Sequence, residues 1–454
     1  MAIQTQNPAT GEVLKTFTPH TDAEVDIAIS QAVIAQHELQ EWSFDQRSKA
    51  MDKMASILEN EAETLAKIIT TEMGKPYGQA VGEVKKCAWV CRYYSENAEA
   101  HLESKHIKTE ATESYRAFFP LGVIMAVMPW NFPFWQVFRF AAPALMAGNT
   151  ALLKYASNVP QCALAMEDIF NRAGFPKGAL VTLLIGGAKV ERILRDDRIR
   201  AATLTGSEPA GASVASICGS EIKPTVLELG GSDAFIIMPS ADIEKAVDFG
   251  CKARLLNNGQ SCIAGKRFFI HADIYDDVKA RFVNMFNSLT IGDPMDPSMD
   301  IGPLVNKDSY EEISQQVETA LKAGAKRVFG ARPIKGDGFY FEPGILEDIP
   351  EESAAYHEEI FGPVMLLFKV DNIDEAIRIA NESPFGLGSS VWTQDKDEQA
   401  KAIRGLEAGA TFVNAMTTSH PHLPFGGIKK SGYGRELAEE GVRTWSNVKT
   451  IYVA

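Results

Sequence analysis

Between residues 122 and 229 the sequence alternates short apolar runs with stretches of helical periodicity. The runs that predict strands are "GVIMAVM", "TALLK", "ALVTLLI", "AATLT" and "TVLEL". A repeated strand–helix–strand order predicts a parallel sheet with helices on both faces. The alternation restarts after Gly231, with "DAFIIM", "RFFIH", "GPVMLLFKV", "SSVWT" and "ATFVN". The sequence therefore predicts two α/β domains, each with its own sheet.

The first hundred residues have a helical pattern instead. A capping box, "TDAE", lies at Thr21 to Glu24, and apolar residues follow it with helical spacing at positions 25, 28, 29, 32 and 33. A second long helix is expected to end near Gly74. No internal repeat, low-complexity tract or obvious linker divides the chain.

The composition excludes several classes of partner. The chain has 454 residues, of which 45% are hydrophobic, so it can bury a large core. Its 45 basic and 59 acidic residues give a formal charge of -14. This charge would repel nucleic acid and anionic membrane surfaces, so we expect neither as a partner. A small anionic substrate would need a local cation.

No segment predicts export or a membrane span. The N-terminal "MAIQTQNPATGEV" lacks the charged-then-apolar order of a secretory signal, so we expect the protein to stay in the cytoplasm. The most apolar stretch, Ala117 to Phe138, is long enough to cross a bilayer. Three prolines and Asn131 interrupt it, however, and Arg139 follows directly. We interpret it as buried core plus a functional turn.

The cysteines and histidines predict neither disulfides nor a metal site. The six cysteines form no paired CxxC motif, which favours reduced thiols; they lie at positions 87, 91, 162, 218, 251 and 262. The eight histidines never form HExxH, and the pair His420 and His422 is more typical of a loop than of a metal site.

The glycine-rich turns give only a weak indication of a nucleotide. The G-x-G-x-x-G dinucleotide fingerprint is missing from every turn that follows a predicted strand. The nearest candidates are Gly186-Gly187 and "GSEPAG" at 206 to 211, each of which begins a helix after a strand. Free backbone N–H groups and the helix dipole favour a phosphate there. Glycines at such positions nevertheless more often only make a tight turn.

One cysteine, Cys262, lies in the small polar turn "NNGQSCIAGKR" at 257 to 267. Because a free cysteine is most often a small buried hydrophobe, the case for a nucleophile depends on other motifs. These are "PWNFP" at 129 to 133, "LELGG" at 227 to 231 and "EEIFGPV" at 358 to 364. Taken singly, Asn131 could be a turn residue, Glu228 a surface carboxylate and Glu359 a helix-end charge.

In this order and spacing, the four motifs resemble those of the aldehyde dehydrogenase superfamily. The resemblance extends from "NPATGEV" near the start to "PFGGIKKSGYGRE" at 424 to 436. It implies two doubly wound, Rossmann-like α/β domains plus a small β oligomerisation element, and hence a homodimer or homotetramer. The cofactor-binding domain would comprise 1–101 and 121–229, the catalytic domain 230–425, and the oligomerisation element 102–120 and 437–454.

The resemblance also implies a reaction. Cys262 would attack the aldehyde carbon, because that carbon must become tetrahedral before it can give up hydride. The side-chain amide of Asn131 and the backbone N–H of Cys262 would stabilise the resulting oxyanion. Glu228 would activate the water that cleaves the thioester. The presence of Glu228 separates acid-forming enzymes from relatives that pass the acyl group to coenzyme A.

By the same resemblance, Lys154 and Glu359 would contact ribose hydroxyls, and Phe361 would pack near the nicotinamide. Ser207 would lie beside the pyrophosphate at the start of its helix. Trp130 and Gly206 belong to the same set of cofactor contacts.

Around Lys154 the stretch "KYASNVP" departs from the common family pattern. Tyr155 replaces a usual proline, and Ser157 replaces a glutamate that many NAD-preferring members carry. A neutral serine does not repel the 2′-phosphate of NADP and can donate a hydrogen bond to it, so NADP should be accepted, with or without NAD. Ser232 stands where lysine is common in the family, and we assign it no function.

The substrate is inferred from two further positions. Arg139 matches an arginine that holds the substrate carboxylate in succinate semialdehyde dehydrogenases, and Ser419 matches a serine that assists it. The alternative for Arg139 is that it is a buried partner of an acidic residue. A further arginine, expected six residues before the nucleophile, is absent: Leu256 stands there, with Arg254 two residues earlier.

The sequence thus predicts an NAD(P)-dependent dehydrogenase that oxidises a short semialdehyde, most simply succinate semialdehyde to succinate. One alternative is another short aldehyde, such as glutarate semialdehyde, an aminobutyraldehyde or a neutral aldehyde, with Arg139 merely structural. Another is an inactive family member that serves as a binding or scaffold protein. The complete set of Asn131, Glu228 and Cys262 argues against inactivity.

Overall fold

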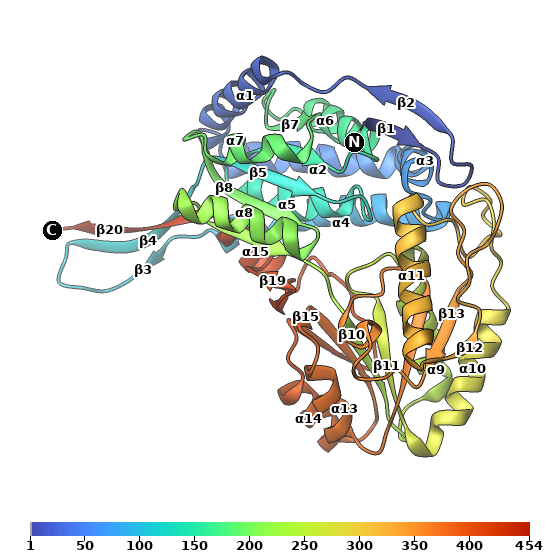
Figure 1. The fold of residues 1–454 in the computed structure, drawn as a ribbon. Coiled ribbons are helices and arrows are strands. Elements are labelled where there is room, and N and C mark those ends of the chain that lie inside the picture. The colour runs from blue at the N-terminus through green and yellow to red at the C-terminus, as the bar shows by residue number, and fades with distance from the viewer. Residues whose placement is uncertain (1) are drawn as a thin grey trace.

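The computed structural model describes residues 2–454, and two sheets flanked by helices form its core (Figure 1). The first sheet has six strands in the order β19-β9-β8-β5-β6-β7. The second has seven, in the order β12-β13-β14-β11-β10-β16-β17. Every strand expected in the two α/β repeats is present, so the predicted fold class is confirmed.

The first sheet is built from β5 (Val123–Met128), β6 (Thr150–Tyr155), β7 (Leu180–Leu183), β8 (Ile199–Thr205), β9 (Thr225–Glu228) and β19 (Gly432–Tyr433). Strands β5 to β9 are parallel, whereas β19 is antiparallel to β9. The order β7-β6-β5-β8-β9 is that of a Rossmann fold, in which the strand order reverses between the first and fourth strands. The carboxyl ends of β5 and β8 therefore border the crevice where such folds bind ligands.

Helices cover both faces of this sheet, so its strands are buried on both sides. The helices are α1 (Asp22–Gln40), α2 (Phe44–Asn60), α3 (Ala62–Met73), α4 (Tyr77–His101), α5 (Trp135–Met146), α6 (Pro160–Ala173), α7 (Val190–Leu194), α8 (Glu208–Ser220) and the 3₁₀ helix η1 (Gly187–Lys189). Along β5, Ile124 and Ala126 pack with α2 to α6, whereas Val123 and Met125 pack with α1, α7 and α8. Helix α5 is buried along its whole length.

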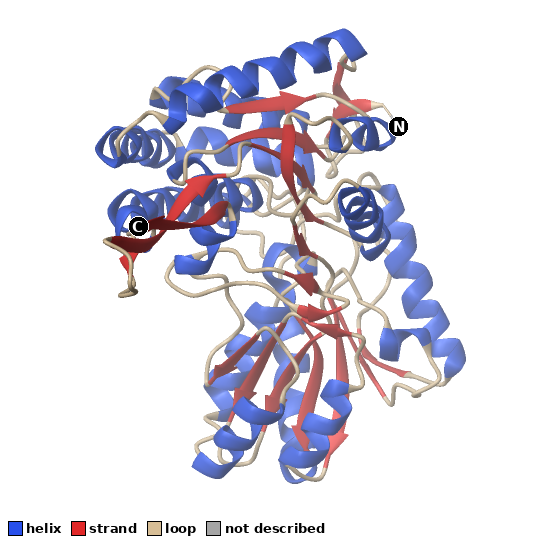
Figure 2. Cartoon of the chain, turned by 90° about the vertical axis from the view of Figure 1, so that its left-hand side faces the viewer, coloured by secondary structure: helices blue, strands red, loops and turns tan. Residues whose placement is uncertain are grey.

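The second sheet is built from β10 (Asp233–Ile237), β11 (Gly265–His271), β12 (Lys326–Phe329), β13 (Gly344–Glu347), β14 (Val364–Val370), β16 (Gly388–Trp392) and β17 (Ala410–Val413). Its helices are α9 (Ile243–Leu255), α10 (Tyr275–Asn287), α11 (Lys307–Ala323), α12 (Ala354–His357), α13 (Ile373–Asn381) and α14 (Lys396–Gly405), with the 3₁₀ helices η2 (Leu256–Gly259) and η3 (Ala272–Ile274). The strands run between two layers of helices (Figure 2). Phe235 and Ile237 pack with α9 and α10, whereas Ala234 and Ile236 pack with α11, α13 and α14.

The N-terminal region is helical as expected, with one addition. The Thr21 hydroxyl accepts a hydrogen bond from the N–H of Glu24 and the Glu24 side chain accepts from Thr21, so the predicted capping box is present. Gly74, with a φ of 75°, ends α3. Before these helices, β1 (Ile3–Gln6) and β2 (Val13–Phe17) form an antiparallel hairpin that the helical pattern did not predict.

A third sheet projects from the body of the molecule at the end that carries the C-terminus (Figure 1). It consists of β3 (Lys105–His106), β4 (Glu113–Pro120) and β20 (Ser446–Val453), all antiparallel. Strand β18 (Ile428–Lys429), which lies in none of the expected domain ranges, pairs with β15 (Phe385–Gly386). Helix α15 (Ala438–Thr444), within the expected oligomerisation element, packs against α4 and α5. None of the helices described over 2–454 combines the length and apolar composition of a membrane span.

The turn that leads to Cys262 has an unusual backbone. Asn257, Asn258 and Gly259 have φ values of 58°, 57° and 75°, in the left-handed region that residues with side chains rarely adopt. A β-carbon at Gly259 would lie 2.4 Å from the backbone of Gly362, so only glycine fits there. The turn therefore needs strong contacts with its surroundings to keep this conformation.

Arg254, in the last turn of α9, provides those contacts. Its fully buried guanidinium donates hydrogen bonds to the carbonyls of Gly259 (2.7 Å), Gly265 (3.2 Å), Ile360 (3.3 Å) and Gly362 (2.5 Å). Burial lowers the pKa of Arg254 to about 9. This side chain joins the turn before Cys262 to the loop before β14.

We predict that Arg254→Met lowers the free energy of unfolding by about 2 to 5 kcal/mol, because several buried carbonyls lose their donor. Urea denaturation followed by tryptophan fluorescence measures this change. Arg404→Met is the matched control, since Arg404 lies exposed on α14. Equal stabilities of the two variants would show that Arg254 does not hold the turn.

Candidate functional site

A cavity of about 700 Å³ lies at the crevice beside the carboxyl ends of β5 and β8. Its lining comes from both α/β units: Trp130 and Gly206 follow strands of the first sheet, whereas Glu359 and Phe361 belong to the second unit. Cys262 lies in the wall between them. A volume of this size is typical of small-molecule and cofactor sites.

Cys262 is the only one of the six cysteines that is not fully buried within the described chain, and all six thiols are free. Burial raises the pKa of Cys262 to about 12, while the positive charges of Lys266 and Arg139 lower it. Lys266 donates to the carbonyls of Ser261 and Cys262, each at 2.7 Å, and pairs with Glu359 at 2.8 Å. The thiolate is the reactive form of a cysteine, so burial disfavours it here and the two cations favour it.

Two N–H donors accompany this sulfur. The amide of Asn131 is oriented by Gln136, whose Nε2 donates to Asn131 Oδ1 at 2.8 Å. Asn131 Nδ2 donates one hydrogen to the carbonyl of Gln260 at 3.2 Å, which leaves its second hydrogen free. The backbone N–H of Cys262 has no acceptor among residues 2–454. Free N–H donors beside a nucleophile are the components of an oxyanion hole.

The loop of Asn131 is also held from the neighbouring strand. Tyr155, at the end of β6, donates from its hydroxyl to the carbonyl of Pro133 at 2.6 Å. This contact gives a structural reason for the tyrosine that departs from the common family pattern.

Glu228, the last residue of β9, is buried, and neither of its carboxyl oxygens has a hydrogen-bond partner in the described chain. Burial raises the pKa of Glu228 well above its usual value; Arg139 opposes this shift and Glu436 adds to it. Glu436 is also buried, but it forms a direct ion pair with Arg139. Glu228 has no such direct contact with the guanidinium.

Arg139 on α5 thus has an internal partner. Besides the ion pair with Glu436, its guanidinium lies 4.6 Å from the centre of the Phe425 ring, and Nη2 is 3.4 Å from Thr205 Oγ1. This ion pair agrees with the alternative interpretation of Arg139 as the buried partner of an acidic residue. That Arg139 binds a substrate carboxylate stays a prediction. Glu436 lies within a quoted motif but was not singled out, although a buried arginine indicates that an acid must be nearby.

Ser419 lies in a different cluster. Its buried hydroxyl accepts hydrogen bonds from Trp135 Nε1 and from Lys86 Nζ, both at 2.9 Å. The sequence analysis did not single out Lys86, because a lysine on an amphipathic helix is normally solvated.

The cavity lining includes five of the predicted cofactor residues, namely Trp130, Gly206, Ser207, Glu359 and Phe361. Ser207 is the N-cap of α8 but makes no side-chain capping bond, which leaves the N–H groups of the first helical turn available to an anion. Lys154 and Ser157 lie at the carboxyl end of β6, outside this lining. Of the two glycine turns, only "GSEPAG" opens a long helix; Gly186-Gly187 precedes the short η1.

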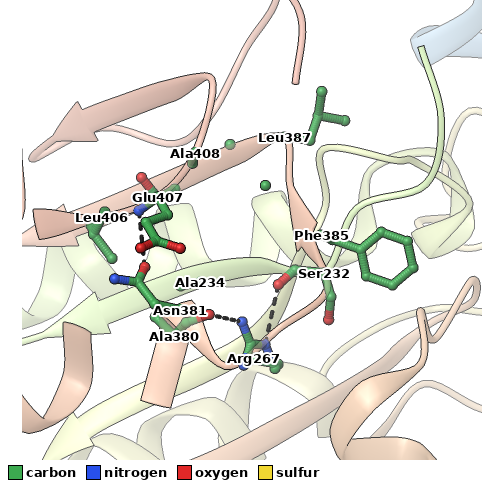
Figure 3. A pocket seen from close by; sticks show the side chains of 13 residues that line it. Ser232, Ala234, Arg267, Ala380, Asn381, Phe385, Leu387, Leu406, Glu407 and Ala408 are labelled. Carbon is green, nitrogen blue, oxygen red and sulfur yellow. Dashed lines mark hydrogen bonds between the residues drawn. The ribbon is translucent and has the colours of Figure 1, made fainter. Parts of the chain in front are cut away.

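A second, much smaller cavity of about 20 Å³ lies beside Ser232 and Arg267 (Figure 3). Arg267 donates to the carbonyls of Ser232 at 3.2 Å and Ala380 at 2.6 Å. The volume has room for about one water molecule, so it cannot hold a substrate. Ser232 thereby has a structural contact. Among residues 2–454, no group of three or more His, Cys, Asp or Glu side chains could hold a metal ion.

Known proteins with the same arrangement identify the family. Residues 1–451 match the model of the aldehyde dehydrogenase family. The chain is 53% identical to the "Succinate-semialdehyde dehydrogenase [NADP(+)] 1" of Mycobacterium tuberculosis, over 100% of both chains. It is 52% identical to the "Succinate-semialdehyde dehydrogenase [NADP(+)]" of Mycobacterium avium, over 100% of this chain and 97% of that one.

A solved structure agrees with these relatives. The succinic semialdehyde dehydrogenase of Streptococcus pyogenes, in complex with NADP+ as the cofactor, superposes with a TM-score of 0.97 at 37% identity, and each chain is covered over 100% of its length. The full-length match to the family model, the close relatives and the shared fold give one conclusion: the chain belongs to the aldehyde dehydrogenase family.

Proposed function

We propose that this chain oxidises succinate semialdehyde to succinate, with NADP+ as the hydride acceptor and an acyl intermediate on Cys262. The observation that carries the proposal is the partly exposed Cys262 thiol beside the free N–H donors of Asn131 and its own backbone. The substrate and the cofactor are those in the names of the M. tuberculosis and S. pyogenes proteins. The neutral Ser157 is compatible with this cofactor and also with NAD+.

In the first half-reaction the Cys262 thiol releases its proton to water, and its sulfur attacks the aldehyde carbon. Negative charge then develops on the aldehyde oxygen, where the Asn131 amide and the Cys262 N–H donate hydrogen bonds, each worth about 3 to 4 kcal/mol. Lys266 fixes the carbonyls of Ser261 and Cys262 and so keeps the N–H between them in a constant orientation. A bound nicotinamide would supply the hydride acceptor, and loss of hydride from the carbon leaves a thioester on Cys262.

In the second half-reaction Glu228 takes a proton from the water that cleaves the thioester. Burial raises the pKa of Glu228 well above its usual value, which makes its carboxylate a stronger base. Of the ion pair beside it, Arg139 favours the ionised form of Glu228, whereas Glu436 disfavours it.

The residues of the cavity fit a dinucleotide. The uncapped N-terminus of α8 at Ser207 would hold the pyrophosphate, and Lys154 and Glu359 would hold the ribose hydroxyls. Trp130 and Phe361, whose ring centres are 5.8 Å apart, would border the nicotinamide. Ser157 would donate to the 2′-phosphate.

The roles of the nucleophile and the base are tested by separating the two half-reactions. We predict that Cys262→Ala abolishes NADPH formation, because no adduct can form. Glu228→Gln should keep a single burst of NADPH but lose about 10² to 10⁴-fold in steady turnover, because only thioester hydrolysis needs the base. Stopped-flow absorbance of NADPH measures both phases. A steady rate near wild type in Glu228→Gln would remove Glu228 from the mechanism.

The position of the 2′-phosphate is tested at Ser157. We predict that Ser157→Glu raises the KM for NADP+ about a hundredfold and that for NAD+ far less, because a carboxylate would face a phosphate of like charge. Ser157→Ala is the matched control and should change NADP+ binding only modestly. If both cofactors' KM values rise by the same factor in Ser157→Glu, the 2′-phosphate does not lie there.

The projecting sheet of β3, β4 and β20 is the proposed oligomerisation element. Strand β20 is at its edge, so its backbone groups on one side are unpaired within the sheet. Phe119, Val448 and Tyr452 on this sheet are exposed apolar side chains, Val448 with 57% of its surface accessible. An apolar edge strand of this kind supports pairing with a second copy of the chain, in a dimer or tetramer.

We predict that Val448→Asp shifts the protein to monomers, because a charge would be buried in the interface. Sedimentation velocity measures the assembly. Val13→Asp is the control, since Val13 is similarly exposed but lies on the β1–β2 hairpin. An unchanged oligomer in Val448→Asp would exclude this sheet as the interface.

A further inference from the structure

Lys86 on α4 is the centre of a small polar cluster that the reaction steps above do not use. Its Nζ donates to Ser419 Oγ at 2.9 Å and lies 4.2 Å from the centre of the Trp135 ring. The indole Nε1 of Trp135 donates to the same oxygen at 2.9 Å. Ser419 and Trp135 are both buried, and Lys86 is partly buried.

The charge of Lys86 is not balanced by its neighbours. No carboxylate of residues 2–454 forms an ion pair with it. Glu83, one helical turn earlier on α4, already pairs with Lys75 and accepts the N–H groups of Phe134 and Trp135 at 2.8 and 3.0 Å. Burial lowers the pKa of Lys86 to about 8, and the positive charge of Arg139 adds to this shift. Near neutral pH the cluster is therefore a cation without a counter-charge.

The hydrogen-bonding capacity of the cluster also points to an anion. Ser419 Oγ accepts two hydrogen bonds, and its own hydrogen has no acceptor in the described chain. Lys86 uses one of its three N–H groups on Ser419. The free groups of both side chains are thus donors. A carboxylate, with two oxygens that only accept, satisfies both donors at once.

The cluster is connected to the reacting centre through α5. Trp135 is followed by Gln136, the residue that orients the amide of Asn131. Arg139, one turn further, is close enough to act electrostatically on both Lys86 and Cys262. Gln136 lines the cavity that contains Cys262, so the cluster adjoins this cavity through α5.

We propose that Lys86, assisted by Ser419, binds the carboxylate at the far end of the aldehyde substrate and so selects semialdehydes over neutral aldehydes. The inference rests on the proposed function, and it names the cation that a chain of net charge -14 must supply. The three other candidate positions are accounted for: Arg139 pairs with Glu436, Arg254 binds backbone carbonyls, and Leu256 is apolar.

The test compares a semialdehyde with a neutral aldehyde of the same length. Lys86→Met should lower kcat/KM for succinate semialdehyde about thirtyfold, mainly through KM, because one partner of a charge pair is lost. For butanal the same variant should change kcat/KM by no more than about threefold, since butanal has no carboxylate. Lys86→Arg should restore most of the loss. Ser419→Ala should show the same selectivity with a smaller effect.

The matched control is Lys85→Met, which removes the same charge from an exposed position next to Lys86 on α4. It should leave kcat/KM unchanged for both aldehydes, which excludes a general effect of net charge. Equal losses for both aldehydes in Lys86→Met, or no loss for the semialdehyde, would overturn the assignment of Lys86.

Succinate as an inhibitor of butanal oxidation tests the cluster without succinate semialdehyde turnover. The account predicts competitive inhibition of the wild type and an inhibition constant raised about thirtyfold in Lys86→Met. Equal inhibition of the two proteins would contradict the role of Lys86. A wild type that oxidises butanal but not succinate semialdehyde would instead contradict the proposed function, whatever the inhibition shows.

Discussion

The hydrogen bonds of the Arg254 guanidinium are the interaction on which the active-site geometry depends. They connect the left-handed turn before Cys262 to the loop that contains Glu359 and Phe361. Cys262 and two of the predicted cofactor contacts, Glu359 and Phe361, are therefore held together. A guanidinium suits this task, because its fixed fork can donate to several carbonyls at once and stays protonated despite burial.

Other buried charges fix the elements around this unit. Glu83 accepts the first N–H groups of α5, and Glu72 accepts those of Gln161 and Cys162 at the start of α6. Carboxylates at helix N-termini are favoured by the free N–H groups and by the helix dipole. Glu83 holds the start of α5 against α4, and Glu72 holds the start of α6 against α3. Arg254, Glu83 and Glu72 thus bind other parts of the chain. Lys86, by contrast, donates one hydrogen bond to Ser419 and keeps further N–H groups for a ligand.

The sequence predicted the parts of the fold that depend on local pattern. Apolar runs identified the buried strands such as β5 and β10, and a capping box identified the start of α1. The β1–β2 hairpin was not predicted, because Val13–Phe17 is mostly exposed and has no buried face that would make apolar and polar residues alternate. Strand β19 was not predicted either, because two residues are too few to show the alternation of a strand.

In the site, the prediction of Cys262, Asn131 and Glu228 rests on quoted motifs whose residue types and spacing are specific. Residues that act through contacts across the fold could not be found in this way. Glu436 pairs with Arg139 over almost three hundred positions, and Lys86 meets Ser419 over a separation of 333. A single sequence carries no signal for such pairs beyond the general need of a buried charge for a partner.

The central claim, an acyl intermediate on Cys262, is tested most directly by mass spectrometry of acid-quenched protein. Glu228→Gln mixed with succinate semialdehyde and NADP+ is digested, and its peptides are searched for a succinyl group. The account predicts one succinyl thioester per active site, on the peptide that contains Cys262 and on no other cysteine. NADPH formation without this adduct, or an adduct on another residue, would contradict it.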